Sequence, residues 1–269
     1  RNSAARAFLR PAMKRHNVTV LTSTQVTKIL FDGKRAVGVE YKKSGTLGQA
    51  RAASEVILAA GAIGSPHLLM LSGIGPAAHL KDVGIGVVAH ASNVGQNLND
   101  HQGLNYTWRM KVPTYNDILR PWWGKALVGM KYLLTGNGPL AKSINHAGGF
   151  FRTSPDLVRP NMQLYFQAFS TLLPRMGERP LLTPDPFSGL SIGLSNCRPT
   201  SRGEITLKSA DPFTHPKIRA NAYSTDRDVE EMLAAVKYLR HIAKQEPICS
   251  LIAEELRPGP EVQCDDDLI

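Results

Sequence analysis

The feature that most constrains the fold is an uninterrupted apolar run, Val56–Ala60, that leads directly into Gly61. Because apolar and polar residues do not alternate in it, the run is typical of a strand buried on both faces, as in a parallel sheet flanked by helices. Ser65 and Pro66 match a helix N-cap followed by proline at the first helical position, which predicts a helix over His67–Leu71. A strand, a glycine turn and a helix in this order bring backbone N–H groups and the positive end of a helix close to an anion.

Two glycine patterns in this stretch have different meanings. At Gly61 the missing Cβ lets either a ligand or another segment of the chain approach the backbone, and the pattern alone favours neither. The sequence GIGPAA at 73–78 formally matches the Gly-x-Gly-x-x-Ala dinucleotide fingerprint. That fingerprint follows a strand and opens a helix, whereas 73–78 follows a predicted helix and contains Pro76. We therefore interpret it as a helix stop and a turn.

The segment before the apolar run predicts a helix and a β-hairpin. Residues 3–15 predict a helix interrupted or kinked at Pro11. Its cationic residues recur every four positions, at Arg6, Arg10 and Lys14. β-Branched residues dominate 17–45, where Asp32 and Gly33 separate two strand-like runs. Because Asp-Gly suits a tight turn with positive φ, these runs predict a hairpin.

From about residue 104 the pattern changes to short strand-like runs separated by turn residues, which predicts a mainly antiparallel sheet. One strong helix follows at 224–245, with Ser224 or Thr225 as its cap, acidic residues first and basic residues last, as the helix dipole favours. Its predicted buried face consists of Val229, Met232, Leu233, Val236 and Leu239.

Composition narrows the function classes. The net charge of +10 comes from scattered Lys and Arg with no interleaved aromatic array, which argues against nucleic-acid binding. An anionic cofactor and a missing acidic portion of the protein both fit this charge. The three cysteines lie far apart, and no pair of the eight histidines has zinc-ligand spacing. No run approaches the roughly 18 apolar residues of a membrane span, which leaves peripheral membrane association open. The Asp100–His101 pair resembles a tuned base, but without an accompanying nucleophile we interpret it as structural.

The motifs together resemble the glucose–methanol–choline (GMC) flavin oxidoreductase family. GAIGSPHLLMLSGIG at 61–75 resembles a family signature, and NVGQNLNDH at 93–101 resembles the segment that follows it. The preceding helix and β-meander, and the later runs at 148–166 and 201–218, also resemble family elements in the family's order. The likeness extends over nearly all 269 residues and is strongest to bacterial FAD-dependent alcohol and choline dehydrogenases.

This resemblance implies a fold and a cofactor. The implied fold is an α/β (α+β) mixture: residues 1–103 as the middle part of an FAD-binding, Rossmann-like domain with a β-meander, and 104–269 as a mainly antiparallel sheet-and-helix substrate domain. It implies FAD as the cofactor, held through main-chain groups of Val26, Ala60, Gly61 and Ala62. The family's first Gly-x-Gly-x-x-Gly motif and its catalytic His segment have no counterpart here. The resemblance therefore implies an internal fragment with no catalytic residue of its own.

The resemblance also implies a reaction. The protein is expected to oxidise a primary alcohol to an aldehyde by hydride transfer to flavin, with oxygen or a quinone as electron acceptor. Choline-oxidising members carry Glu just before AGGF, where this chain has His146, a poor partner for a quaternary ammonium. His146 is thus a substrate-pocket candidate that lowers the expectation of choline, although a structural role is the alternative. The expected location is cytoplasmic, with association at the inner membrane left open. The rival interpretation is an inert truncated chain, or a subunit that needs a complementary chain.

Overall fold

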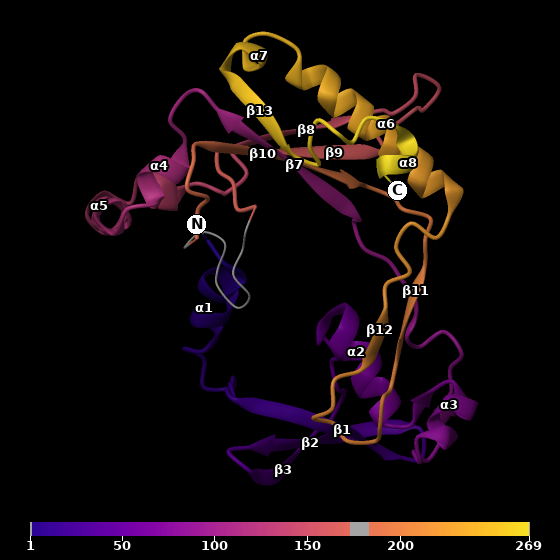
Figure 1. Cartoon of the computed structure of the whole chain (residues 1–269). Helices are drawn as coiled ribbons and strands as arrows, with labels where there is room; N and C mark the ends of the chain where they lie inside the picture. The colour runs from indigo at the N-terminus through magenta and orange to yellow at the C-terminus, as the bar shows by residue number, and fades with distance from the viewer. Residues whose placement is uncertain (1, 173–182, 269) are drawn as a thin grey trace. The chain divides into compact units, whose positions relative to one another are not determined.

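The computed structural model describes residues 2–172 and 183–268, which divide into two compact units (Figure 1). The N-terminal unit consists of residues 2–100 and 201–222, and the C-terminal unit of 101–200 and 223–268. Each unit mixes helices and strands, so the predicted α/β class is confirmed. Residues 201–222 pack with the N-terminal unit, whereas the sequence assigned them to a domain at 104–269; the family's own domain boundary stays a prediction.

A β-meander forms the first part of the N-terminal unit. Strands β1 (Thr24–Asp32), β2 (Arg35–Lys43) and β3 (Thr46–Arg51) pair antiparallel in that order. The turn between β1 and β2 places Gly33 at φ +57°, so the predicted Asp-Gly hairpin is confirmed.

The predicted first helix is short and irregular. It consists of a π-helical segment, η1 (Ala5–Leu9), followed by one α-helical turn, α1 (Arg10–Ala12). The change from π to α geometry comes just before Pro11, which has no N–H to donate. The predicted interruption at this proline is therefore confirmed.

The strand predicted at Val56–Ala60 is wrong for this structure. The segment has no regular secondary structure and belongs to no sheet, and Ile57 is 80% exposed. A fully buried strand needs partners on both edges, and no described residue provides one. The predicted N-cap at Ser65 is also wrong, since α2 begins four residues earlier and spans Gly61–Leu71.

The GIGPAA segment is a helix stop, as predicted. Gly73 follows α2 at φ +86°, and a Cβ there would lie 2.4 Å from the carbonyl oxygen of Gly86. The chain then forms a two-residue strand and a short helix that begins after Pro76. The remaining elements of the N-terminal unit are β4 (Ile74–Gly75), α3 (Ala77–Asp82), β5 (Ala89–His90), β6 (Gln96–Leu98), β11 (Gly203–Thr206) and β12 (Lys217–Arg219).

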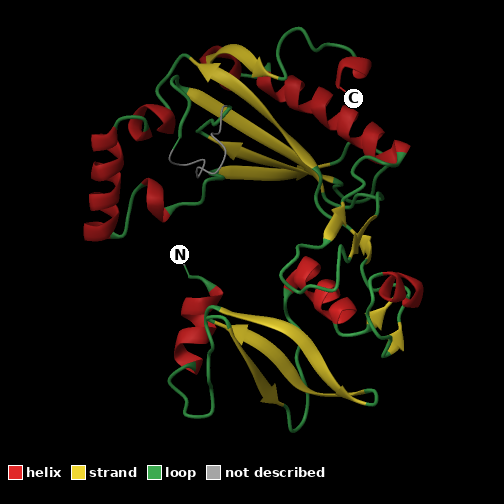
Figure 2. Ribbon diagram, turned by 60° about the horizontal axis from the view of Figure 1, so that its bottom comes forward, coloured by secondary structure: helices red, strands yellow, loops and turns green. Residues whose placement is uncertain are grey.

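The C-terminal unit is built on a five-stranded antiparallel sheet of order β13-β7-β10-β9-β8, with the long helix α6 (Asp226–Ala243) along one face (Figure 2). The predicted antiparallel sheet is therefore confirmed. Its strands are β7 (Gly103–Met110), β8 (Ala147–Phe151), β9 (Met162–Gln167), β10 (Gly189–Asn196) and β13 (Ile252–Arg257). The helices besides α6 are α4 (Tyr115–Leu119), α5 (Trp122–Thr135), η2 (Pro139–Ala141), α7 (Ile248–Leu251) and α8 (Asp265–Leu268).

Helix α6 packs against the sheet much as its periodicity predicts. Thr225 is the N-cap residue, and Met232, Val236 and Leu239 are buried. The predicted Val229 and Leu233 are only half-buried, because the buried stripe includes Ala235. These residues join the inward-facing side chains of β7, β9 and β10 in the core of the unit. No helix among the described residues is long and apolar enough to cross a membrane.

Candidate functional site

A pocket in the N-terminal unit lies beside the start of α2. It is lined by Val26 and Ile29 of β1, the segment Val56–Ala60, and the inner side of α2. Its empty volume is about 950 Å³, and it opens to solvent. Most of the lining is apolar side chain and main chain, which is a surface suited to a flat ring system.

Gly61 begins α2 in a backbone conformation that only glycine adopts readily. Its φ is +82°, and a Cβ built on it would meet no atom within 4 Å. Of the two interpretations of this glycine, a close protein contact finds no support among the described residues, whereas open space beside the main chain suits a ligand. As at every helix start, the first N–H groups of α2 have no partner within the helix.

The neighbouring N–H group of Ala60 is already occupied. It donates a hydrogen bond of 3.1 Å to Oγ of Ser65, one turn into α2. Ser65 thus lies inside the helix, where its hydroxyl accepts from a residue that precedes the helix and does not cap the N–H groups that follow it. A ligand at this edge therefore has the first turn of α2, rather than the N–H of Ala60, to bind.

Ala62 lies on the other side of the helix start. Together with Ser65 and Pro66 it lines a second pocket, whose opposite wall is Asn93–Asn99. The empty volume of this pocket is about 770 Å³. Of the four predicted cofactor residues, Val26 and Ala60 thus line one pocket, Ala62 lines another, and Gly61 lies between Ala60 and Ala62 in the chain.

His67 was not singled out from the sequence, yet it faces the first pocket. Burial, and then the charge of His215, lower its pKa below the usual 6.5. The ring is therefore neutral at pH 7. Because His215 is far away in the sequence, no local pattern could have revealed this pairing.

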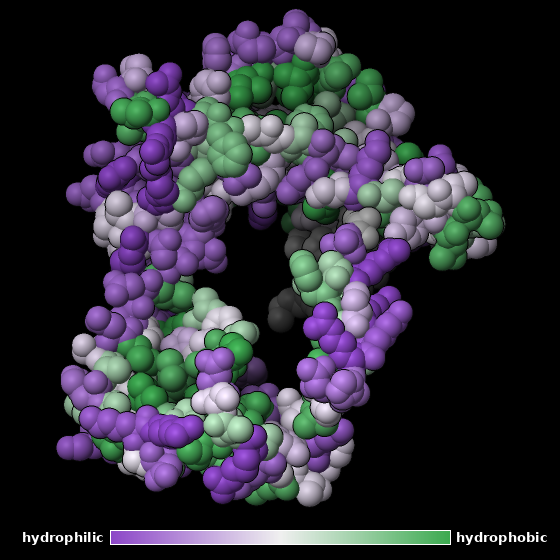
Figure 3. Space-filling model, turned by 180° about the vertical axis from the view of Figure 1, so that it is seen from behind, coloured by the Kyte–Doolittle hydropathy of each residue, from purple (hydrophilic) through white to green (hydrophobic). Residues whose placement is uncertain are grey.

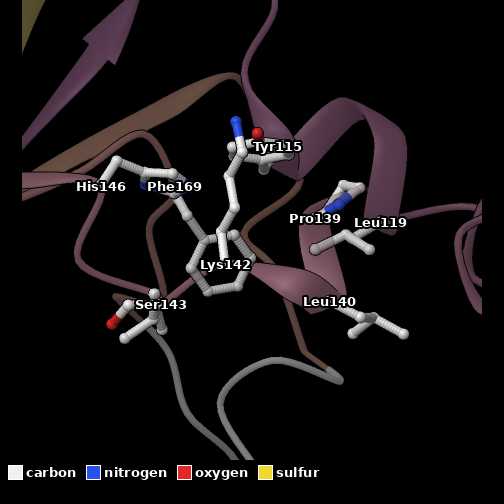
Figure 4. Close-up of a pocket in the computed structure, with 9 residues that line it drawn as sticks. Tyr115, Leu119, Pro139, Leu140, Lys142, Ser143, His146 and Phe169 are labelled. Carbon is white, nitrogen blue, oxygen red and sulfur yellow. The ribbon is translucent and has the colours of Figure 1, made fainter. Parts of the chain in front are cut away.

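The pocket around His146 belongs to the C-terminal unit (Figure 4). The imidazole stacks on the ring of Tyr115, with 4.8 Å between centroids and 15° between planes. Its Nδ1 accepts a 3.4 Å hydrogen bond from the N–H of Ala168. The empty volume is about 480 Å³, and Leu119 and Phe169 provide apolar walls. The predicted substrate residue thus lies in a small, partly aromatic pocket.

The electrostatics of this pocket favour an uncharged imidazole. Although the ring is partly open to solvent, burial lowers the pKa of His146 below 6.5, and the ammonium group of Lys142 lowers it further. Figure 4 shows the side chain of Lys142 extending along the same pocket. At pH 7 the pocket therefore presents a neutral ring with a cation beside it.

A buried polar network holds α4 behind the His146 pocket. Nδ2 of Asn116 donates 3.1 Å hydrogen bonds to the carbonyl oxygen and Oγ of Ser170. The hydroxyl of Ser170 in turn donates a 2.6 Å bond to Oδ2 of Asp185. Because these three side chains are almost fully buried, the network fixes the position of α4 and, with it, the stacked ring of Tyr115.

The sheet face that points away from α6 is rich in hydroxyl and amide groups. The hydroxyls of Thr107 and Ser191 lie 3.1 Å apart, and those of Tyr165 and Ser195 lie 2.9 Å apart. The hydroxyl of Tyr165 also donates a 2.8 Å bond to Gln163. Sequence reasoning missed these residues, although the alternation of polar and apolar residues along β7 and β10 was a signal that could have found them.

Other histidines have structural partners. Nε2 of His79 accepts a 2.9 Å bond from the N–H of Leu207, and Nδ1 of His90 accepts a 3.2 Å bond from the N–H of Ala77. His101 is the first residue of the C-terminal unit, directly after the boundary with the N-terminal unit. Within the described part of the chain, no three His, Cys, Asp or Glu side chains gather as a metal site would require.

Comparison with known proteins identifies the family. The GMC oxidoreductase sequence pattern matches residues 1–103 with its N-terminal part and 199–269 with its C-terminal part. The chain belongs to the GMC oxidoreductase family. Enzymes of this family use FAD, so FAD is the cofactor that family membership indicates for this chain.

Curated GMC relatives match the whole of this chain. The oxygen-dependent choline dehydrogenase of Pseudomonas entomophila is 38% identical over 272 residues, which are 100% of this chain and 47% of the relative. The enzyme of the same name from Staphylococcus aureus is 36% identical over 273 residues, or 46% of its length. The chain therefore spans about half the length of the curated relatives it matches.

Solved structures of the family have the same fold. A formate oxidase of Aspergillus oryzae superposes with a TM-score of 0.85 at 26% identity, covering 94% of this chain and 48% of the oxidase. A pyridoxine 4-oxidase superposes with a TM-score of 0.80 over 100% of this chain, but at 23% identity it supports the fold alone. The GMC fold is thus common to proteins with different substrates, so the substrate has to be argued from the site.

Proposed function

We propose that the protein containing this chain is an FAD-dependent oxidoreductase that converts a primary alcohol to an aldehyde. Family membership supports the reaction class, and the open main-chain position at Gly61 supports the cofactor site. The bound flavin would supply the acceptor for the hydride that leaves the alcohol carbon. The chain itself would contribute a surface that binds the cofactor and a pocket that binds the alcohol.

The N-terminal unit would hold the dinucleotide mainly through main chain. Val26 and Ala60 would present backbone and small side chains to the adenosine portion, while Gly61 leaves space beside the first turn of α2. Ala62, which lines the second pocket, would contact a neighbouring part of the same cofactor. Unpaired N–H groups at a helix start stabilise negative charge, which fits a pyrophosphate.

The His146 pocket would hold the substrate, and its charge favours a neutral alcohol. An uncharged imidazole beside Lys142 offers hydrogen bonding but no anion to a cationic group. Choline is the second candidate, because the curated relatives named above are choline dehydrogenases. Against it, a cation near Lys142 would be repelled, and only the faces of Tyr115 and Phe169 would attract it.

The electron acceptor would be oxygen or a quinone. The relatives are named as oxygen-dependent, which favours oxygen. A quinone would require access to a membrane, which peripheral membrane association would provide. The chain's location would in either case be cytoplasmic or at the inner membrane surface.

A rival proposal is that residues 1–269 alone are inert, and that activity needs a complementary polypeptide segment. The observation that supports it is the segment Val56–Ala60, whose apolar side chains and backbone have no sheet around them. The two proposals are compatible if the remaining strands are present in a longer protein.

The cofactor site can be tested with two matched glycine substitutions. Gly61→Ala and Gly33→Ala both place a Cβ at positive φ with no atom within 4 Å, so both should destabilise the fold similarly, by about 1 kcal/mol. Only Gly61→Ala should lower the FAD content of the purified protein, measured by absorbance after denaturation. Equal FAD content in the two variants would rule out the proposed site.

A further inference from the structure

Helix α5 displays most of its apolar side chains outward. Val128 and Gly124 are the buried positions of the helix. Val128 joins a small core with Leu119 and Phe169, and a Cβ on Gly124 would clash with the carbonyl oxygen of Ile118. The exposed large residues are Trp122, Trp123, Leu127, Met130, Leu133 and Leu134. Trp122, Leu133 and Leu134 are 80%, 84% and 78% exposed, so packing in the described chain does not explain them.

These exposed residues form one stripe. With 3.6 residues per turn, positions 122, 126, 130 and 133 follow one line along the helix, and 123, 127, 130 and 134 follow the adjacent line. On the same helical wheel, Lys125 lies at one border of the stripe and Lys131 at the other. Figure 3 shows hydrophobic surface at the edge of the C-terminal unit where α5 lies in Figure 1.

The segment that contains the stripe is mainly positively charged. Residues 110–146 contain five Lys or Arg and one acidic residue, Asp117. That carboxylate is engaged internally, since its Oδ2 accepts a 2.8 Å bond from the N–H of Thr114 and a 2.7 Å bond from the hydroxyl of Ser188. The segment that contains α5 therefore has an excess of positive charge even though Arg120 pairs with Asp117, and an anionic occupant would complement it.

We propose that the outward face of α5 docks on the surface of an anionic lipid membrane. A helix with adjacent tryptophans, long aliphatic residues and bordering lysines is suited to lie in the interface, with its apolar stripe among the acyl chains. The lysines reach the headgroups while their methylene stems stay near the apolar layer. A protein partner fits less well, because lysine is depleted from protein interfaces. This docking does not depend on the reaction proposed above.

The test is vesicle flotation of the flavin-loaded protein, with phosphatidylcholine vesicles and with vesicles that contain phosphatidylglycerol as well. The protein should float with the anionic vesicles and much less with the neutral ones. Tryptophan emission should shift to the blue on binding, because two of the three tryptophans lie on α5 and the third, Trp108, is already buried. No flotation, or equal flotation with both vesicles, would overturn the proposal.

Substitutions on α5 test whether this helix is the part of the protein that binds the vesicles. Leu133→Gln combined with Leu134→Gln should weaken anionic-vesicle affinity at least about tenfold, and Lys131→Glu at least about fivefold. Val158→Gln is the matched control, since Val158 is 93% exposed and lies outside α5. A lower unfolding midpoint of the leucine variant would show that the protein itself covers the stripe. A change from dimer to monomer without vesicles would identify a second copy instead. Either result would overturn the proposal.

Discussion

At the scale of single residues, His146 is the side chain that we propose sets the substrate preference of the C-terminal unit. Burial and Lys142 keep its pKa below 6.5, so the ring is neutral at pH 7, and the described residues that line the pocket include no Asp or Glu. The ring of Tyr115 is the only stacked partner of His146 among the described residues. With the substrate in this pocket, Glu at position 146 would place a carboxylate beside a cation that contacts the ring of Tyr115, whereas His146 leaves the cation with the aromatic ring alone.

We predict that His146→Glu shifts specificity toward choline. The introduced carboxylate would lie beside Tyr115 and would attract a quaternary ammonium, while the loss of the imidazole costs a neutral alcohol little. The ratio of kcat/KM for choline to kcat/KM for a neutral primary alcohol should rise about tenfold, which corresponds to ~1.4 kcal/mol. His146→Gln, which is uncharged, should leave this ratio within about twofold of the original. An unchanged ratio in the Glu variant would place the substrate elsewhere.

Residue roles were predictable from the sequence only where local geometry determines them. Gly33 adopts positive φ, as the chemistry of an Asp-Gly turn predicts, whereas the positive φ of Gly61 was not predicted. By contrast, the environment of His67 depends on His215, and that of His146 depends on Tyr115. Such pairs are created by tertiary packing, which no periodicity encodes.

At the scale of elements, the sequence succeeded where an element is stabilised by its own pattern. The β1–β2 hairpin has its turn residues, and α6 has its cap and apolar stripe. The prediction of a strand at Val56–Ala60 was wrong because a parallel strand forms only when neighbouring strands hydrogen-bond to it. The start of α2 was misplaced because Ser65 followed by Pro66 matches the residue pattern of a helix start, whereas in the structure both residues lie inside the helix.

The first turn of α6 contains a carboxylate whose role is structural. Asp228 is almost fully buried and accepts bonds from the N–H and the hydroxyl of Thr200, at 2.7 and 2.9 Å. Replacement by alanine would leave a backbone donor without its partner in a dry environment. We predict that Asp228→Ala lowers the free energy of unfolding by about 2–3 kcal/mol, measured by urea denaturation.

Asp226 provides the control for this prediction. It lies in the same helical turn but is exposed, so Asp226→Ala should cost about 0.5 kcal/mol through the helix dipole alone. If the two variants lost equal stability, the bonds to Thr200 would contribute nothing beyond the dipole.

At the scale of the whole molecule, the two units carry different parts of the proposed chemistry. The N-terminal unit contains the main-chain site at Gly61, and the C-terminal unit contains the His146 pocket and the α5 stripe. The units were partly visible in the sequence, since the change of pattern near residue 104 is close to the boundary after residue 100. The return of residues 201–222 to the N-terminal unit was not visible, because β11 and β12 resemble any other short strands.

The segment Val56–Ala60 has two alternative states in the whole protein. It stays exposed, or it becomes a strand between neighbouring strands that a longer protein supplies. Ile57 is 80% exposed in an apolar segment that pairs with no strand among the described residues, and such a segment is prone to pair with another chain. We predict that Ile57→Lys reduces aggregation of residues 1–269 expressed alone several-fold, measured by light scattering, because charge blocks edge-to-edge pairing.

In a longer protein that supplies strands on both sides, the same Ile57→Lys change should have the opposite effect. A lysine buried there without a partner would lower the free energy of unfolding by about 3 kcal/mol or more. Leu47→Lys is the control, since Leu47 is 63% exposed on the paired strand β3 and should be neutral in both proteins. If Ile57→Lys were harmless in the longer protein, the segment would remain exposed there. The backbone position at Gly61 would then lack the rigid sheet that a dinucleotide site requires, and the flavin proposal would lose its structural basis.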